Sequence, residues 1–552
     1  MDTLVHTTGY SRTTINWSVS VVYGLVAALL PCNTALLLPP TAVAFYHAQE
    51  TWDLLTLASY SATILYRVSP LHPLSRYPGP FWCKTSKIWW SLLTLRGYGH
   101  YRLKVLHKRY GDVVRIGPNE LSIRDPEAIA PLLGAAGVPK GPGIVGSILA
   151  SGQRAEDTAM IGLVDVDEHL RRRRPWNRAF GSAAVKEYEP LIARRTRQLL
   201  DALSQQEGAV ELGKWFNYFS YDSMCDMAYG GGSELLRDGD ANNVWALLNH
   251  GVILGAFFCH LPWLGPYVGS IPGAAGPLTT LMGHARRFAA ARIQRGSSTR
   301  DLFHYLNNED LPEKPPPPTK QLVDDSILAI LAGADTTSSA ILSVVFCLAT
   351  HPQAHAKLQT EVDKFFPAGE DILSAPDFKD MHYLSAVINE ALRLYPPAPG
   401  GGQARKVPAD ASPVAVGSLI LPPGTYFWIH AYSIHRDPRN FAHPDAFWPD
   451  RWLVASGRIP LAAASQPPTA TSQPTTAPLT HNESAFFPFS HGPMNCPGKP
   501  LAQLELRMVV CAFLQRFRFR LAEGWDVREY ERGYKDHFVA SRPELPVVLE
   551  AR

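Results

Sequence analysis

The chain has 552 residues, of which 46% are hydrophobic and 18% are charged, and its formal net charge is +3. This composition provides a sizeable core and excludes disordered and collagen-like chains, and the near-neutral charge indicates no nucleic-acid partner. The seven cysteines have no C-x-x-C motif and no paired spacing. They indicate neither a disulfide framework nor a zinc ribbon, so we expect a reducing compartment. At about 150 residues per domain the length allows three or four domains, although a single large enzyme domain fits too.

The first predicted element is a membrane anchor within residues 1–66. Thr13–Gln49 contains no Asp, Glu, Lys or Arg, and a stretch this apolar is favourable in lipid and unfavourable in water. Prolines interrupt it, so one long span, a hairpin of two spans and a further short segment at 54–66 all remain open. A cleaved signal peptide is the alternative. Basic residues such as Arg67 and Lys84 follow the stretch, which predicts a cytoplasmic body by the positive-inside rule.

A proline-rich hinge at 67–81 is predicted to join the anchor to a single domain at 82–552. Prolines fix φ and cannot continue a helix, so this segment is expected to be stiff. The domain has many segments of helical periodicity and few strand-like runs, which predicts a mainly α-helical fold with small β-sheets. The expected helices include Leu191–Leu203, Val244–Phe258, Leu278–Gln294, Gln321–Ala349 and Pro352–Phe366, and the expected strands include Asp112–Ile123, Tyr426–His430 and Phe517–Leu521.

Two segments of the domain are predicted to be surface loops. Glu313–Thr319 contains four consecutive prolines. Residues 455–480 are rich in Pro, Thr, Ser, Ala and Gln and carry no charge after Arg458. Such low-complexity segments cannot bury enough apolar surface to pack into a core.

The predicted helix at Leu328–Phe346 is interrupted by small and polar residues, among them Gly333, Asp335 and Thr336. A glycine in mid-helix costs about 1 kcal/mol relative to alanine, and a groove widened over a flat ligand would offset that cost. A hydroxyl linked through water to a carboxylate can carry protons into a dry site. Asp335 and Thr336 are therefore candidates for proton delivery. The alternative is a polar helix face satisfied by carbonyl groups four residues earlier.

Glu390 and Arg393 are three residues apart and therefore neighbours on one helical face. Exposed ion pairs with this spacing are common, and each contributes roughly a few tenths of a kcal/mol to stability. The pair precedes a Pro-Pro-Ala-Pro segment and, further along, Pro449–Trp452 with Arg451.

The most informative segment is Ala485–Phe513, in which a loop rich in Gly and Pro leads to Cys496 just before an apolar helix. A thiolate at a helix N-terminus is stabilised by the helix dipole and by free N–H groups, so Cys496 can be an anionic metal ligand. Gly492 and Gly498 are expected to let the backbone turn tightly beneath a flat macrocycle. The other six cysteines are interpreted as small buried hydrophobic residues.

Phe489, Gly492, Cys496 and Gly498 form the pattern F-x-x-G-x-x-x-C-x-G, which resembles the haem loop of the cytochrome P-450 monooxygenases, in the style of fungal microsomal members. The resemblance extends from the hinge to the carboxyl end. It implies haem b as the cofactor, with Cys496 as the proximal thiolate ligand of the iron. It further implies that one atom of O2 is inserted into a lipophilic small molecule of secondary metabolism. Electrons would come from NADPH through a flavin-containing reductase, with cytochrome b5 as an optional donor, at the endoplasmic reticulum membrane.

The resemblance also assigns roles outside the cysteine loop. His169 and Arg173 match an aromatic residue and an arginine that the family directs to the haem propionates, and Arg405 matches a second such arginine. Arginine forks suit carboxylates. Glu390, Arg393 and Arg451 resemble a buried structural network. The remaining basic residues either form a face for an acidic reductase or serve solubility; they are Arg171, Arg172, Arg174 and Lys499.

Two positions depart from the family pattern. Met494 stands where many members have Arg or His, so a propionate contact is missing. Pro497 follows Cys496 and has no N–H, which removes one donor to the thiolate and should lower the iron potential.

Two alternative functions remain open. A haem-thiolate isomerase or dehydratase would need no O2, but intact Asp335 and Thr336 disfavour it. A non-catalytic haem-binding protein is the other. Substrate contacts are expected in residues 134–152, 212–258, 399–403 and 538–540, whose apolar character fits a lipophilic molecule.

Overall fold

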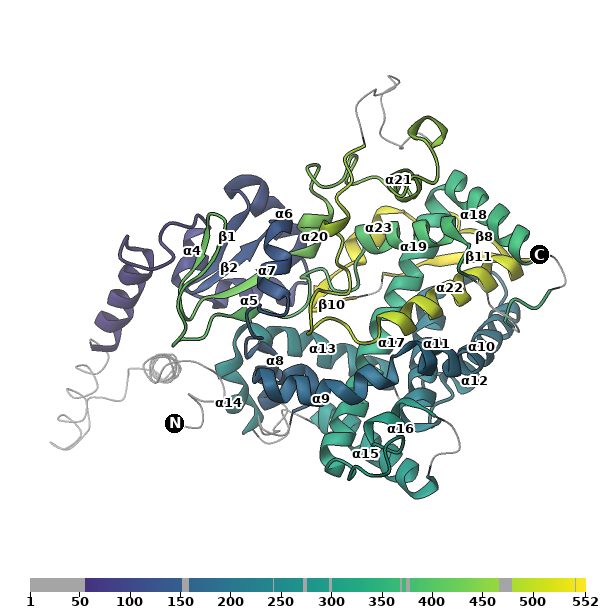
Figure 1. The fold of residues 1–552 in the computed structure, drawn as a ribbon, viewed down its shortest axis with the longest axis horizontal. Coiled ribbons are helices and arrows are strands. Elements are labelled where there is room, and N and C mark those ends of the chain that lie inside the picture. Colours follow the sequence, from purple (N-terminus) through teal and green to yellow (C-terminus); the bar gives the residue numbers. More distant parts are fainter. Residues whose placement is uncertain are drawn as a thin grey trace, which may run out of the picture.

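The computed structural model describes residues 55–150, 158–241, 243–271, 276–296, 300–367, 370–373, 378–465, 479–541 and 543–552. Most of the predicted anchor therefore lies outside the described residues, and so do residues 466–478 of the predicted insert. Residues 55–68, which comprise the end of the predicted anchor and the first two residues of the predicted hinge, are helical and project from the body in purple in Figure 1.

The domain is mainly α-helical, as the sequence predicts. Its α-helices are α4 (Phe81–Thr85), α5 (Ile88–Leu95), α6 (Gly99–Tyr110), α7 (Ile129–Leu133), α8 (Gly143–Ala150), α9 (Val166–Ala179), α10 (Ser182–Ser204), α11 (Leu212–Tyr229), α12 (Leu235–Asp238), α13 (Val244–His260), α14 (Gly265–Gly269), α15 (Gly276–Arg295), α16 (Leu302–Leu306), α17 (Thr319–Thr350), α18 (Pro352–Phe365), α19 (His382–Leu394), α20 (Ala431–His435), α21 (Asp450–Ala455), α22 (Lys499–Arg516) and α23 (Arg528–Gly533). The five helices expected from periodicity are confirmed as α10, α13, α15, α17 and α18.

The strands form small sheets. They are β1 (Val113–Gly117), β2 (Glu120–Ile123), β3 (Ala209–Glu211), β4 (Arg405–Lys406), β5 (Val414–Val416), β6 (Leu419–Leu421), β7 (Tyr426–Ile429), β8 (Phe517–Leu521), β9 (Asp536–His537), β10 (Val539–Ala540) and β11 (Pro546–Ala551). The largest sheet has the order β1-β2-β7-β4, and another has the order β3-β11-β8. The run expected at Asp112–Ile123 is a hairpin of two strands, because the chain turns at Pro118 and Asn119 between β1 and β2.

Helix α17 lies in the middle of the helical part of the domain, where α11, α15, α19 and α22 all contact it (Figure 1). Residues of these helices share one large buried apolar cluster, for example Ile341, Phe216 and Val509. Within the described residues, α17 is the one helix long and apolar enough to cross a membrane, but 67% of its most apolar window is buried inside the protein. Its apolar character is therefore explained by its place in the core.

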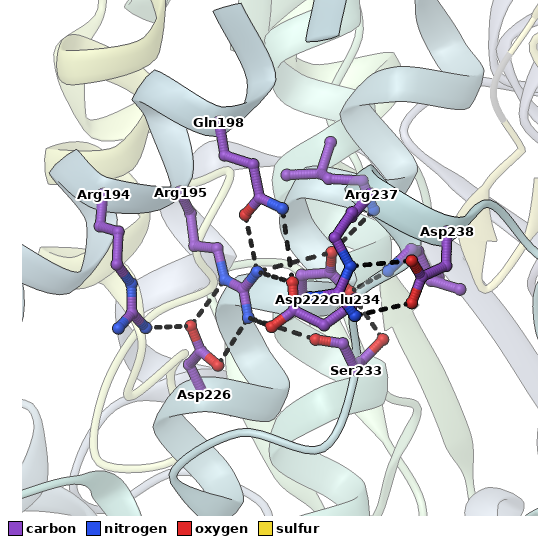
Figure 2. Close-up of polar contacts among 11 residues, drawn as sticks. Arg194, Arg195, Gln198, Asp222, Asp226, Ser233, Glu234, Arg237 and Asp238 are labelled. Carbon is purple, nitrogen blue, oxygen red and sulfur yellow. Dashed lines mark hydrogen bonds and ion pairs between the residues drawn. The ribbon is translucent and has the colours of Figure 1, made fainter. Parts of the chain in front are cut away.

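A buried network of charges joins α10 to α11 and α12 (Figure 2). The guanidinium group of Arg195 donates to Asp226 at 2.7 and 2.8 Å and to Glu234 at 2.8 Å. Asp222 accepts the backbone N–H groups at the start of α12, from Leu235 and Leu236. Because both aspartates lie on α11, the network fixes the helix that packs most extensively on α17.

Candidate active site

A cavity of about 270 Å³ lies between α9, α17, α22 and the loop that precedes α22. Many of the residues proposed from the sequence line it, although they come from segments far apart in the chain. They are His169, Arg173, Thr336, Arg405, Phe489, Cys496 and Gly498. Met224, Gly401, Gly402, Gln403 and Phe538, from the segments expected to contact substrate, line it as well.

The cysteine loop is held by a backbone hydrogen bond from the N–H of Cys496 to the carbonyl of Phe489, at 3.0 Å. Gly492 has a φ of +75°, and a Cβ there would lie 2.0 Å from the carbonyl oxygen of Leu133. A side chain is therefore excluded, as the sequence predicts. Gly498 has a φ of −78°, which other residues adopt as well, so its backbone conformation does not require glycine, and its place beneath a macrocycle stays a prediction. A Cβ there would lie 3.9 Å from the sulfur of Cys496.

The thiol of Cys496 opens onto the cavity at the start of α22. Burial raises the pKa of this thiol, while the N–H groups of Gly498 and Lys499 and the guanidinium of Arg173 act in the opposite direction. These groups would stabilise a thiolate, as expected at a helix N-terminus. Pro497 has no N–H and so offers no hydrogen bond to the sulfur, but the N–H groups of Gly498 and Lys499 remain as donors.

Four basic side chains line another part of the cavity: Lys140, His169, Arg173 and Arg405. All four are buried. Within the described part of the chain, no ion pair links any of them to a carboxylate, and Nε2 of His169 and Nε of Arg405 have no hydrogen-bond partner. Burial and the neighbouring Arg405 and Arg173 lower the pKa of Lys140 to about 7. Burial is also the main cause that lowers the pKa of His169 to about 4 and the pKa of Arg405 to about 10.

This arrangement fits the haem that the resemblance implies. A haem needs an axial ligand and counter-ions for two propionates, and the cavity offers a thiol together with basic groups that lack acidic partners. Lys140 lies in the segment 134–152 that was expected to contact substrate, but its place among these basic groups was not predicted. The sequence does contain a sign of a special role, because Lys140 is the only charged residue between Glu127 and Arg154.

Two contacts tie the basic residues to the cysteine loop. Nη1 and Nη2 of Arg173 donate to the backbone and side-chain oxygens of Asn495, at 2.6 and 2.9 Å. Nη1 of Arg405 lies 2.9 Å from the sulfur of Met494. Met494 therefore contacts the arginine that the resemblance assigns to a propionate.

Helix α17 contributes Gly333 and Thr336 to the cavity wall. The groove expected at Gly333 stays a prediction, and the structure adds a packing reason for the glycine. A Cβ on Gly333 would lie 2.5 Å from the sulfur of Met224 on α11. The hydroxyl of Thr336 donates to the carbonyl of Ala332 at 2.6 Å. Asp335 is not among the residues that line the cavity.

A further cavity residue that the sequence did not indicate is Glu505 on α22. Its carboxyl lies 3.4 Å from the hydroxyl of Thr337, and its Oε1 has no partner among the described residues. Burial raises the pKa of Glu505 to about 8. The group therefore holds a proton at neutral pH. In the sequence it is one acidic residue in a helix that also carries basic residues, a pattern typical of an exposed pair.

Glu390, Arg393 and Arg451 form one fully buried network away from the cavity. Arg393 donates to both carboxylate oxygens of Glu390, at 2.8 and 2.9 Å, and Arg451 donates to Oε1 at 3.0 Å. The carboxylate also accepts the N–H of Trp448 and the indole N–H of Trp452. Burial by itself would raise the pKa of Glu390, but the two arginines lower it to about 2.

Fewer of the proposed basic residues lie on the surface than the sequence predicts. Arg172 is buried and pairs with Asp325 at 2.7 Å, so its assignment to the surface is wrong. Arg171, Arg174 and Lys499 are exposed. Arg171 and Arg172 differ because neighbouring residues of a helix point about 100° apart.

Comparison with known proteins agrees with this geometry. The family model of Cytochrome P450 matches residues 78–546. The chain is 33% identical over 509 residues to Cytochrome P450 monooxygenase FCK2 of Fusarium pseudograminearum, which covers 91% of this chain and 86% of that protein. It is 30% identical to Cytochrome P450 monooxygenase nodW of Hypoxylon pulicicidum, over 96% of this chain and 93% of that protein. It is also 30% identical to the tryprostatin B 6-hydroxylase of Aspergillus fumigatus, over 89% of this chain and 83% of that protein.

Proposed function

The chain belongs to the cytochrome P450 family and is a monooxygenase, and from this premise we propose that it inserts one oxygen atom of O2 into a lipophilic small molecule of fungal secondary metabolism. The observation that carries the proposal is that one cavity brings the Cys496 thiol together with basic groups that have no acidic partner among the residues the structure describes. The relatives are fungal monooxygenases, and the name of one of them states that it hydroxylates tryprostatin B. Their activity disfavours the isomerase and the non-catalytic alternatives.

The proposed cofactor is haem b. When bound, it supplies the activation of O2 and the transfer of one oxygen atom. The sulfur of Cys496 binds the iron, with Phe489, Gly492 and Gly498 shaping the loop around it. Arg173, Arg405, His169 and Lys140 bind and orient the propionates.

Protons reach the cavity through hydroxyl and carboxyl groups. The hydroxyl of Thr336 already donates to Ala332, so its oxygen is left to accept a hydrogen bond from a water in the cavity. Asp335, one residue earlier, is the proposed source of these protons. The raised pKa of Glu505 makes its carboxyl a second group that holds a proton beside the cavity.

The substrate is proposed to be lipophilic because apolar side chains dominate the cavity wall. Leu328, Met224 and Phe538 are examples. Such a wall excludes water and favours an apolar molecule.

Electrons are proposed to come from an NADPH-dependent flavin reductase, with cytochrome b5 as an optional second donor. The exposed Arg171 and Arg174 lie in the middle of α9, and the exposed Lys499 begins α22, the helix that follows Cys496. A basic face of this kind suits an acidic partner.

The protein is proposed to sit on the endoplasmic reticulum membrane with its domain in the cytoplasm. Beside the helix at 55–68, α4 and α5 expose a group of large apolar side chains. They are Phe81, Trp82, Ile88, Trp89 and Leu92. The rings of Trp82 and Trp89 lie 5.3 Å apart. Tryptophan is enriched where proteins meet the membrane interface.

The proposed function is tested with the haem-loaded chain, a fungal P450 reductase and NADPH, by measuring NADPH consumption and oxygenated products from an extract of lipophilic metabolites. Products labelled from 18O2 that depend on the reductase support the proposal. NADPH-independent conversion without 18O incorporation contradicts it. Cys496→Ser is the matched inactive control.

A further inference from the structure

A second cavity, of about 50 Å³, adjoins the first. Gly402 and Phe538 line both of them. The small cavity is enclosed by α5, α13, β7 and the β9–β10 hairpin. Since one water needs roughly 10–15 Å³ of such space, the small cavity has room for a few waters or for one small functional group. The two cavities therefore share part of their wall at Gly402 and Phe538.

The wall of the small cavity combines aromatic rings with one carboxylate. Trp90, Trp428 and Phe538 supply the rings, and Asp536 supplies the carboxylate. The ring of Trp428 is held by a hydrogen bond from its N–H to Glu120 and lies 5.4 Å from the ring of His260. Aromatic faces beside a carboxylate are the usual surroundings of a bound organic cation.

Asp536 has no cationic partner among the described residues. Its carboxylate accepts the N–H of Phe538 at 3.1 Å, and no ion pair involves it. Burial raises the pKa of Asp536 to about 6, so the group is mostly ionised at neutral pH. Asp536 is half-buried, and a carboxylate in such a site without a counter-ion is less favourable than one in water, so a ligand that brings a positive charge would stabilise it.

The other polar groups at this cavity carry no compensating charge. Burial lowers the pKa of His260 and of His430 well below the usual value, so both rings are neutral. Nδ1 of His260 and Nε2 of His430 have no partner among the described residues. Lys87, which lies close enough to affect His260, is paired with Glu120.

The backbone fixes the position of the carboxylate. The N–H of Asp536 donates to the carbonyl of Gly97 at 2.6 Å, and Asp536 pairs with Ala540 across the hairpin. Phe538, at the tip, has a φ of +76°. Strained backbone of this kind is kept where the surrounding structure holds it.

We propose that the small cavity is a subsite for a protonated amine of the substrate, held by Asp536 and the rings of Trp90, Trp428 and Phe538. The inference rests on the proposed lipophilic substrate and adds a basic nitrogen to it. The nitrogen lies in the small cavity, and the carbon skeleton passes Phe538 into the large cavity. The amine therefore fixes which carbon faces the reacting centre.

The test compares dodecylamine with dodecanol as probes of the haem-loaded protein, by titrating the shift of the Soret absorption band. The variant is Asp536→Asn, which keeps an oxygen to accept the N–H of Phe538 and removes the charge. Asp410→Asn, at an exposed position, makes the same chemical change away from the cavity. We expect wild type and Asp410→Asn to bind dodecylamine about tenfold or more tightly than dodecanol, and Asp536→Asn to lose that preference while binding dodecanol as before.

The direction of the shift reports orientation. With its amine in the small cavity, dodecylamine presents its alkyl end to the iron, and the Soret band moves to shorter wavelength.

Three results would overturn the subsite. They are equal affinity of wild type for the two probes, equal losses for both probes in Asp536→Asn, and binding of uncharged dodecanamide as tight as that of dodecylamine. Binding of dodecanol without an amine preference contradicts the subsite alone. If neither probe shifts the band, the proposed lipophilic substrate class is contradicted as well.

Discussion

The carbonyl oxygen of His435 accepts a hydrogen bond from Nη1 of Arg393, at 2.8 Å. Nε2 of the same histidine accepts the N–H of Phe487, at 3.2 Å. Burial lowers the pKa of His435 to about 3, so the ring is neutral and able to accept. Phe487 begins the loop that leads through Phe489 to Cys496. His435 thus links the buried network of Glu390 and Arg393 to the segment that leads to Cys496.

Glu390→Ala is expected to prevent stable incorporation of haem. The change leaves two fully buried arginines without their carboxylate, at a cost of roughly 3–5 kcal/mol. The measurement is haem absorbance per mole of purified protein, together with the midpoint of thermal unfolding. Glu529→Ala removes an exposed partner of Arg532 instead and should leave both values near wild type. A normal haem content in Glu390→Ala would refute the role given to the network.

Glu505→Gln is expected to flatten the dependence of stability on pH. The folded pKa of Glu505, about 8, lies above its unfolded value of 4.5. Its contribution to stability is therefore full below pH 4.5 and is lost as the pH rises through 8. The loss is on the order of a few kcal/mol.

Thermal midpoints of the haem-loaded proteins between pH 5 and 8 measure this difference. Wild type and the exposed-site control Glu523→Gln should lose more stability across that range than Glu505→Gln. Parallel curves for all three proteins would mean that the carboxyl of Glu505 is not held protonated.

Gly333→Ala is expected to destabilise the protein, although alanine favours helices. The new Cβ would lie 2.5 Å from the sulfur of Met224, and crowding in a packed core costs typically about 1–3 kcal/mol. Combining it with Met224→Ala should recover part of the loss, because the space is then vacated. Thermal unfolding of the two single variants and the double variant forms the test. If the effects of the two substitutions on stability are strictly additive, the added Cβ at position 333 does not clash with the side chain of Met224.

Pro497→Val is expected to raise the reduction potential of the haem iron. The valine adds an N–H beside the sulfur of Cys496, next to the donors already present at Gly498 and Lys499. Hydrogen bonds withdraw charge from the sulfur and favour the reduced iron. A spectroscopic redox titration measures the effect, and an unchanged potential would count against it.

The helices and the cysteine loop could be predicted because each is encoded locally. Helical periodicity identified α17 and α18, and the glycine at 492 sits where only a residue without a side chain fits. The close approach of Gly492 to the backbone of Leu133 depends on the fold, whereas the positive φ of Gly492 is a property of one short segment. Such features are readable without knowing the rest of the fold.

The errors and omissions arise where distant segments meet. Nothing local indicates that Met224 fills the space beside Gly333, or that Asp325 pairs with Arg172. Lys140 and Glu505 belong to no motif that the sequence shows. Their roles depend on a cavity that three or more segments share. Asp335 does not line the cavity although its neighbour Thr336 does, because adjacent helical residues point about 100° apart, and its role in proton delivery stays a proposal.

The central claim is that Cys496 holds haem iron as a thiolate. The most direct measurement is the difference spectrum of the dithionite-reduced, haem-loaded protein with and without carbon monoxide, for wild type and Cys496→Ser. We expect a strongly red-shifted Soret band in wild type and its loss in the variant. A wild-type band at the position of histidine-ligated or neutral-thiol haem, or a red-shifted band that persists in Cys496→Ser, would contradict the account.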